Sequence, residues 1–265
     1  MAENNLTTTK KDVAIAIKEK TYADSVLDAM NALEKQGQLV FPANYAVGNQ
    51  LKLMYSVISQ SPSLMSCTPA SIGQALVEAL IQGLEYEKKQ LYFINMGGKL
   101  VMFRSYFGDM ASAKNTRLVK EIKARVIYED DAYDTDTNEY GELIIVNHKT
   151  NLANLDKNIV GAYAWSVNSD GTKNYCVMTW KEIQQAWNKS KNKGSVHNEF
   201  PQEMSKRTVI RRLVKTLFNS SLNSISKEAK AIIGSFNRTT ENEYMEDSAV
   251  ESNVQNKVVE EEISY

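Results

Sequence analysis

Apolar residues recur at helical spacing through the first third of the chain. Residues 22–35, and a segment that begins near Asn44 and runs through LKLMYSVIS, place apolar side chains every three to four positions, which predicts two helices. A third helix is predicted in CTPASIGQALVEALIQGLEY. Thr68 is a capping residue, Pro69 suits the first helical position, and Gly83 can end the helix in a left-handed conformation.

The apolar period changes to two from Gln90 onward. LYFIN and KLVMF flank MGGK, which predicts a β-hairpin. A short helix is predicted in YFGDMASAKN, followed by strands in EIKARVIYE, ELIIVNH, IVGAYAWSV and YCVMT, with a turn at residues 169–172. Thr179 and Glu182 form a capping box that begins another helix. The predicted fold is therefore α+β: a central antiparallel β-meander flanked by helices, with helical N- and C-terminal segments.

The strands carry many aromatic side chains. At period-two spacing such residues belong to a core more often than to a binding surface, so a core position is expected for most of them. The residues concerned include Tyr92, Phe93, Tyr163 and Trp165.

Length and composition indicate a globular protein. With 265 residues and 43% apolar composition the chain can bury a sizeable core, as one large domain or two small ones. No apolar run approaches the roughly 18 residues of a membrane span, and MAENNLTTTKK lacks the apolar stretch of a secretory signal, so a cytoplasmic location is expected. Cys67 and Cys176 lie far apart, which gives no zinc or disulfide framework.

Charge is divided unevenly along the chain. Residues 239–265 contain eight acidic residues and one basic residue, a net charge of −7, which leaves +6 on residues 1–238 because the whole chain carries −1. A basic body with an acidic tail is a pattern of nucleic-acid-binding chains, although many acidic tails only maintain solubility. Both interpretations of the tail stay open.

The segment EMSKRTVIRRLVKTL, Glu203 to Leu217, combines helical apolar spacing with many cations. Arg207, Arg211 and Lys215 form a row at positions i, i+4 and i+8 beside an apolar stripe. Like charges at this spacing repel by about 0.2–0.5 kcal/mol, and no acid follows Glu203 to compensate. From Lys173 to Lys215 ten basic residues stand against three acids, so a polyanion is the expected partner.

Lys206 is unusual in this segment, because its helical angle falls inside the apolar stripe formed by the residues that follow. Its side chain must extend out of the start of the helix or meet an anion there. The stripe consists of Val209, Ile210, Leu213, Val214 and Leu217.

Several catalytic motifs are absent. GGK at residues 97–99 is no phosphate-binding loop, since Phe93 stands where that motif requires glycine. In DDAYDTDTNEYGE the positions of a calcium loop that require glycine and glutamate hold Glu139 and Ile145, so a solvated loop is favoured. His148 and His197 form no HExxH motif. Neither a catalytic residue, a metal ligand nor a cofactor is predicted.

Five segments in succession resemble a known family. CTPASIGQALVEALIQGLEY, KKQLYFINMGGKLVMFRSYFGDMASAKN, VIYEDDAY, IVGAYAW and EMSKRTVIRRLVK follow, in order and spacing, the pattern of the RecT family of phage and prophage single-strand DNA annealing proteins. The resemblance covers roughly Val40 to Leu217. It implies annealing without ATP, rings or helical filaments on DNA, a 5′→3′ exonuclease partner and distant similarity to lambda Red beta.

The resemblance also indicates site residues. FRSYF is similar to the family's aromatic-basic-glycine turn, with Ser105 where glycine is usual, and Lys206 to Thr208 resemble its Lys-Lys/Arg-Thr segment. Together with the basic row, the expected DNA-binding residues are Lys99, Phe103, Arg104, Lys206, Arg207, Thr208, Arg211, Arg212 and Lys215. The cations are expected to contact phosphates, which leaves base edges free to pair.

The expected organisation has three parts: an N-terminal helical oligomerisation segment at 1–40, a DNA-annealing core at 41–218, and a C-terminal helix with an acidic disordered tail at 219–265. Expected partners are single-stranded DNA, the annealed duplex, further copies of the chain and, as the resemblance implies, the single-strand binding protein of a bacterial host. Two alternatives remain: a non-catalytic RNA-binding or chaperone protein, and a magnesium-dependent nuclease using Glu129, Asp130 and Asp131.

Overall fold

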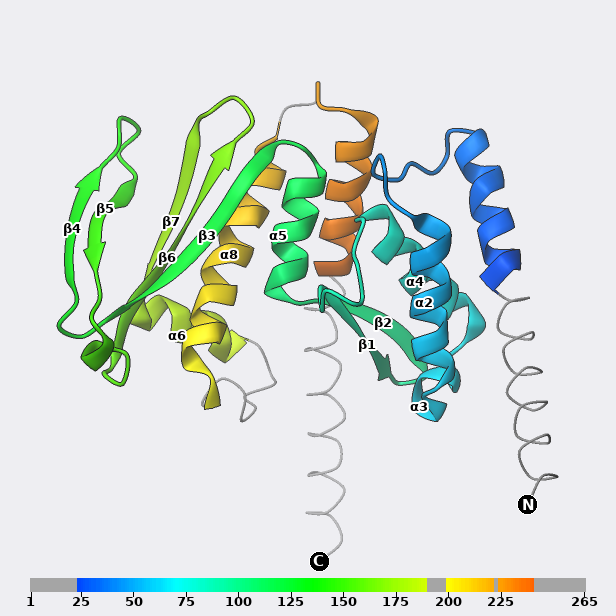
Figure 1. Cartoon of the computed structure of the whole chain (residues 1–265), viewed down its shortest axis with the longest axis horizontal. Coiled ribbons are helices and arrows are strands. Elements are labelled where there is room, and N and C mark those ends of the chain that lie inside the picture. Colours follow the sequence, from blue (N-terminus) through cyan, green and yellow to red (C-terminus); the bar gives the residue numbers. More distant parts are fainter. Residues whose placement is uncertain (1–22, 190–198, 222–223, 241–265) are drawn as a thin grey trace, which may run out of the picture.

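The predicted α+β class is confirmed. The computed structural model describes residues 23–189, 199–221 and 224–240 (Figure 1), in which antiparallel strands are flanked by helices. Two hydrophobic clusters lie side by side. One is built by the N-terminal helices and a β-hairpin, the other by a three-stranded sheet and the helices packed on it.

The first cluster is built around α4 (Pro69–Ile81). Its sequence signals act as predicted: the Thr68 side chain caps the helix by accepting from the Ser71 N–H, and Gly83 follows the helix with φ of +66°. A helix over residues 23–35, α2 (Val47–Ser59) and the short α3 (Pro62–Met65) surround the apolar face of α4. The predicted helix near Asn44 thus begins three residues later.

The predicted hairpin is present and packs against α4. Strand β1 (Leu91–Met96) pairs with β2 (Lys99–Arg104) across a turn at Gly97 and Gly98, both of which have positive φ. Leu91 of β1 and the inward residues Leu100 and Met102 of β2 enter the first cluster. The hairpin leads directly into α5 (Tyr106–Asn115), which joins the two clusters.

The second cluster lies between a sheet of order β3-β6-β7 and α8 (Pro201–Asn219). Strands β3 (Val119–Tyr128), β6 (Ile159–Asn168) and β7 (Lys173–Thr179) are antiparallel. Helix α8 crosses the central strand β6, whose inward residues are small and fully buried: Ala162, Ala164 and Ser166. Small side chains at these positions leave room for the side chains of α8.

The strands do not form one continuous meander. They divide into three sheets, because a hairpin of β4 (Ala132–Thr137) and β5 (Leu143–Lys149) stands between β3 and β6 in the sequence. The solvated loop predicted for DDAYDTDTNEYGE is wrong for residues 132–137, which are exposed but paired with β5. The segment AYDTDT shows no core-facing alternation, since neither face of this strand is buried.

The core position expected for the strand aromatics is only partly correct. Phe93 packs against the first cluster, whereas the Tyr92 side chain is exposed and stacks on Phe103 at a centroid distance of 5.7 Å. Tyr163 and Trp165 are half-buried and lie on the face of the sheet opposite to α8, because they alternate with Ala162 and Ala164 along β6. The period of two identifies a strand but not which face is covered.

Two C-terminal helices complete the described structure. The capping box before α6 (Trp180–Lys189) is confirmed, with Thr179 N–H bonded to Glu182 and Glu182 N–H bonded to Thr179. The helix over residues 227–240 packs against both clusters, through Ala231 and Phe236 (orange in Figure 1). Contacts with the core therefore continue past residue 218. Among the described residues, no helix is long and apolar enough to cross a membrane.

Candidate nucleic-acid interface

Helix α8 is fixed on the sheet by the predicted apolar stripe. Pro201 stands at its first turn, where a missing N–H costs nothing. Val209, Ile210, Leu213 and Val214 are at most 2% exposed. The predicted stripe included Leu217, which is half-buried; the fully inward residue of that turn is Phe218. The basic residues consequently lie along the flanks of the helix.

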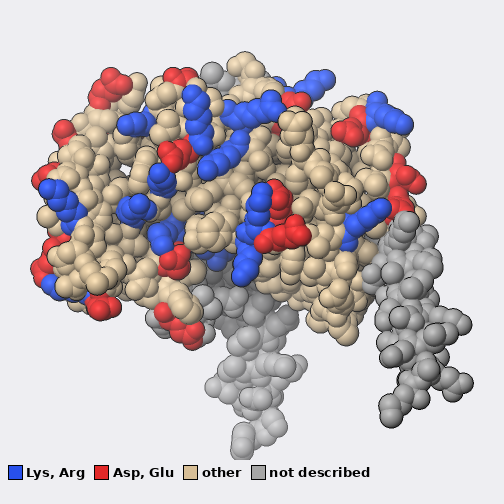
Figure 2. All heavy atoms as spheres, in the orientation of Figure 1, with Lys and Arg blue, Asp and Glu red and all other residues tan. Residues whose placement is uncertain are grey.

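The cations of α8 differ in their exposure. Arg212 and Lys215 are exposed, and Arg207 is partly exposed. The Arg211 side chain is 17% exposed and that of Lys206 is 29% exposed. On the face seen in Figure 2, Lys and Arg side chains gather mainly over the middle of the molecule, while Asp and Glu are frequent toward its left and right margins.

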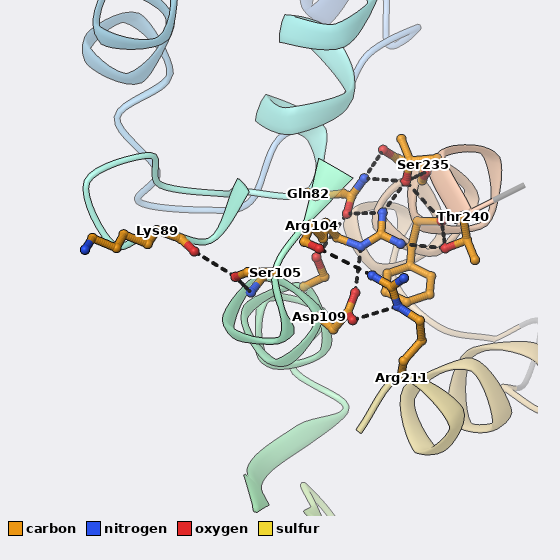
Figure 3. Close-up of polar contacts among 12 residues, drawn as sticks. Gln82, Lys89, Arg104, Ser105, Asp109, Arg211, Ser235 and Thr240 are labelled. Atoms are coloured by element: carbon orange, nitrogen blue, oxygen red, sulfur yellow. Dashed lines mark hydrogen bonds and ion pairs between the residues drawn. The ribbon is translucent and has the colours of Figure 1, made fainter. Parts of the chain in front are cut away.

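Arg211 is held by a buried carboxylate. The Arg211 Nε donates to Asp109 Oδ2 at 3.0 Å, and the Arg104 Nε donates to Asp109 Oδ1 at 2.8 Å (Figure 3). Asp109 is completely buried. Burial alone raises the pKa of Asp109, but the charges of Arg211 and Arg104 and their hydrogen bonds outweigh it and hold this pKa below its usual value. The ion triad joins α5, α8 and β2.

Arg104, which is expected to contact a phosphate, is not a surface residue in this structure. Its side chain is 0% exposed and its guanidinium lies 3.9 Å from the centre of the Phe236 ring. It donates to Gln82 and, on the helix over residues 227–240, to Thr239 and to Thr240 at 2.5 Å. Arg104 occupies an inward position of β2, and apart from Asp109 its partners come from distant parts of the chain, so the sequence around Arg104 does not show which groups would satisfy a buried guanidinium.

The turn after Arg104 depends on a glycine three residues later than expected. Ser105, which stands where the family usually has glycine, has an ordinary φ of −76° and caps α5 by accepting from the Gly108 N–H. Gly108 itself is indispensable, because a Cβ there would lie 2.0 Å from the Gln90 carbonyl oxygen. The close backbone approach in this turn is therefore at Gly108.

Phe103 and Lys99 lie on strand β2 of the hairpin and not on α8. Phe103 is half-buried against Tyr92. Lys99 is exposed at the far end of β2. Five residues of extended strand separate Lys99 from Arg104, a distance of about 16 Å. The structure thus places these two expected site residues on a separate element.

Thr208 has a structural partner. Its hydroxyl accepts from the Trp187 Nε1 at 2.8 Å and donates to the Met204 carbonyl at 2.8 Å. The bond from Trp187 fixes α6 against α8. Of the segment resembling the family's Lys-Lys/Arg-Thr motif, Lys206 and Arg207 offer charged groups to a ligand, while Thr208 aligns the helix that carries them.

Lys206 meets an anion, one of the two expected outcomes. Its ammonium forms an ion pair with Glu203, which is itself largely exposed. Lys206 also lines a pocket of about 330 Å³ beside the edge strand β3, together with Arg125, His148 and Tyr163. Sequence reasoning missed Arg125 and His148 because they belong to elements distant from α8 in the chain.

The three carboxylates of the nuclease alternative have other partners. Asp131 is buried and accepts from Tyr128 N–H, His148, Thr150 and Asn154; burial raises its pKa, but these bonds outweigh it and lower the pKa to about 2. Asp130 forms an ion pair with Lys157, and Glu129 accepts from Asn158. Within residues 23–189, 199–221 and 224–240, no group of three His, Cys, Asp or Glu residues has metal-binding geometry.

Comparison with known families identifies the chain. The RecT family model matches residues 49–256, which include α4, the β1–β2 hairpin, α5, the β3-β6-β7 sheet, α8 and the helix over residues 227–240. The chain belongs to the RecT family. Membership of the RecT family assigns it to single-strand annealing in DNA recombination. The RecT match extends past Leu217, where the recognisable motifs end, and so agrees with the packing of the last helix on the core. No curated protein matches the chain.

Proposed function

We propose that the chain anneals complementary DNA strands without ATP by holding their sugar-phosphate backbones along α8. The observation that carries this proposal is the row Arg207, Arg211 and Lys215, which has no acid within it and whose middle member, Arg211, is anchored by Asp109. An anchored cation loses less side-chain entropy when it binds a phosphate than a freely rotating one does.

Backbone contacts suit annealing for a physical reason. Pairing is downhill by about 1.4 kcal/mol per base-pair step, so no energy source is required. The obstacles are phosphate repulsion, secondary structure within each strand and the search for register. Cations bound to the phosphates reduce the repulsion and the secondary structure, and they leave the base edges free for the search for register. The duplex stays bound because its backbones offer the same contacts.

Further parts of the proposal concern assembly. One monomer covers a few nucleotides, so rings or filaments of the chain supply a contiguous track, with residues 1–40 as the subunit contact. The acidic residues after Thr240 either compete with DNA for the basic row or bind a single-strand binding protein. A 5′→3′ exonuclease supplies the single strands. Distant similarity to lambda Red beta and a cytoplasmic location remain predictions.

A strand-annealing time course without nucleotide tests the proposal. The chain is mixed with two complementary oligonucleotides in sequence, and duplex formation is followed by fluorescence quenching, with Mg²⁺ present in half of the samples. Annealing is expected to be faster than without protein, the DNA is expected to stay intact in Mg²⁺, and RNA strands are expected to anneal less readily than DNA strands. Annealing no faster than without protein contradicts the proposal; cleavage in Mg²⁺ favours the nuclease, and equal action on RNA the chaperone.

A further inference from the structure

The β3-β6-β7 sheet presents a second face, opposite to α8, that combines aromatic and basic side chains. Residues directly opposite each other on paired strands share a face. One row across this outer face is Arg125, Tyr163 and Val177, and the next is Lys123, Trp165 and Tyr175. Both lysine and arginine are exposed, and the aromatic residues are half-buried. This face is therefore accessible from solvent in part.

Two aromatic rings on this face lie side by side, and one of them, Tyr163, is held by a chain of hydrogen bonds. Tyr163 and Trp165 lie with ring centroids 5.7 Å apart and planes inclined by 22°. The Tyr163 hydroxyl bonds to His148 Nδ1 at 3.2 Å, and His148 Nε2 bonds to the buried Asp131 at 2.9 Å. A near-parallel pair of rings, one of them held by hydrogen bonds, offers a planar group a stacking surface that requires little prior ordering.

Two cations from different elements meet at the edge of this surface. Arg125 of β3 and Lys206 of α8 line the pocket of about 330 Å³, with Tyr163 and the hydroxyl of Thr150 beside them. The Arg125 guanidinium donates to the neighbouring Ala124 carbonyl at 3.1 Å and, among the described residues, forms no ion pair. The carboxylate nearest to Lys206, that of Glu203, is exposed and can be displaced by a phosphate.

We propose that this pocket and the adjoining rings bind a single DNA strand through one phosphate and one or two unpaired bases. Arg125 and Lys206 pair with the phosphate, and a base stacks on Tyr163 or Trp165. The proposal rests on the proposed function, because Lys206 belongs to both surfaces: a strand that follows α8 reaches the outer face by crossing the edge of β3. A base within a duplex has no free ring face, so the site selects single strands.

Such a contact complements backbone binding. Stacking uses the flat face of a base, and the edge that forms pairs stays open. A strand retained here is held close to the basic row while the register search proceeds. Stacking contributes roughly a fivefold or greater gain in affinity per base and is indifferent to sequence.

Photocrosslinking tests this assignment. Oligothymidylate with one 5-iododeoxyuridine is irradiated with the full chain, and crosslinked peptides are identified by mass spectrometry. Crosslinks to Tyr163 or Trp165 are expected. Trp165→Leu is expected to weaken single-strand binding about fivefold or more, Trp165→Phe to retain most of the affinity, and duplex affinity to change little. Arg125→Gln is expected to weaken binding. Lys52→Gln is the control: it removes a cation on α2, outside both surfaces, and is expected to leave binding unchanged.

The outcomes separate this inference from the proposed function. Absence of crosslinks in β6, together with wild-type affinity of Trp165→Leu, overturns the outer-face site, while weakened binding by Arg207→Gln in the same assays still supports the basic row. Absence of any single-strand binding by the wild-type chain contradicts both. Trp165→Leu can also lower the melting temperature, and its loss of affinity then does not decide the question. In that case the crosslinks decide it, together with Trp165→Phe, which keeps an aromatic ring, and Arg125→Gln, which changes an exposed side chain.

Discussion

The buried carboxylate of Asp109 is shared by two arginines, so a change at this single residue is expected to affect the stability of the fold. Asp109→Asn leaves the charges of Arg104 and Arg211 without their carboxylate, which costs about 3–5 kcal/mol. The free energy of unfolding, measured in urea, is expected to fall by that amount. Asp156→Asn, at an exposed carboxylate, is the matched control and is expected to change stability by less than about 0.5 kcal/mol. Equal effects of both substitutions contradict the ion triad.

Asp131 makes a pH-dependent contribution to stability. Its pKa is lowered to about 2 in the folded chain, against 3.8 as the ordinary value. A lowered folded pKa means that the contribution is complete above the ordinary pKa and is lost as pH falls from about 4 to about 2. Asp131→Asn is expected to remove this part of the acid sensitivity. Urea unfolding of both chains at pH 7, 4 and 3 measures it; parallel pH curves for the two chains contradict it.

Arg207 tests phosphate binding at the residue scale. Among the described residues Arg207 forms no ion pair, so Arg207→Gln is expected to remove its charge without affecting the fold. Affinity for single strands is expected to fall for all sequences alike, and the slope of log affinity against log salt to decrease by about 0.7. Fluorescence anisotropy at four salt concentrations measures both. A loss confined to particular sequences contradicts backbone binding.

At the scale of elements, local signals were sufficient for prediction and distant contacts were not. The cap at Thr68, the turn at Gly97 and the box at Thr179 act within a few residues, so the sequence predicted them correctly. The burial of Arg104 depends on Thr239 and Thr240, which are 135 and 136 residues away. Likewise, strand order and the outer face of the sheet follow from packing between elements, which a period of two does not encode.

Gly108 and Gly73 give opposite predictions for the same substitution in two helices. Gly108→Ala places a methyl group against the Gln90 carbonyl, which accepts a hydrogen bond from the Ser105 N–H, and is expected to destabilise the chain by about 1–3 kcal/mol. Gly73→Ala in α4 meets nothing within 4 Å and is expected to stabilise it by up to about 1 kcal/mol. Thermal unfolding measures both. Similar melting temperatures for the two variants contradict the close approach between α5 and the segment before β1.

At the scale of the whole molecule, the helix over residues 227–240 determines where the acidic tail can be removed. Thr239 and Thr240 satisfy the buried Arg104, so a deletion that begins at Thr239 disturbs the core as well as the charge. A chain ending at Thr240 is expected to keep its melting temperature. A chain ending at Ile225 is expected to lose stability, because the loss of Phe236 and both threonines leaves their buried partners exposed or unpaired.

The chain ending at Thr240 then tests the tail by charge alone. Removing residues 241–265 raises the net charge by seven, since eight acids and Lys257 are lost. If the tail competes for the basic row, single-strand affinity rises at low salt, and the difference shrinks at high salt, where charges more than a few ångström apart are screened. Anisotropy titrations of both chains at 50 mM and 500 mM salt measure the difference. Equal affinities at low salt contradict competition and leave solubility or partner binding as the role of the tail.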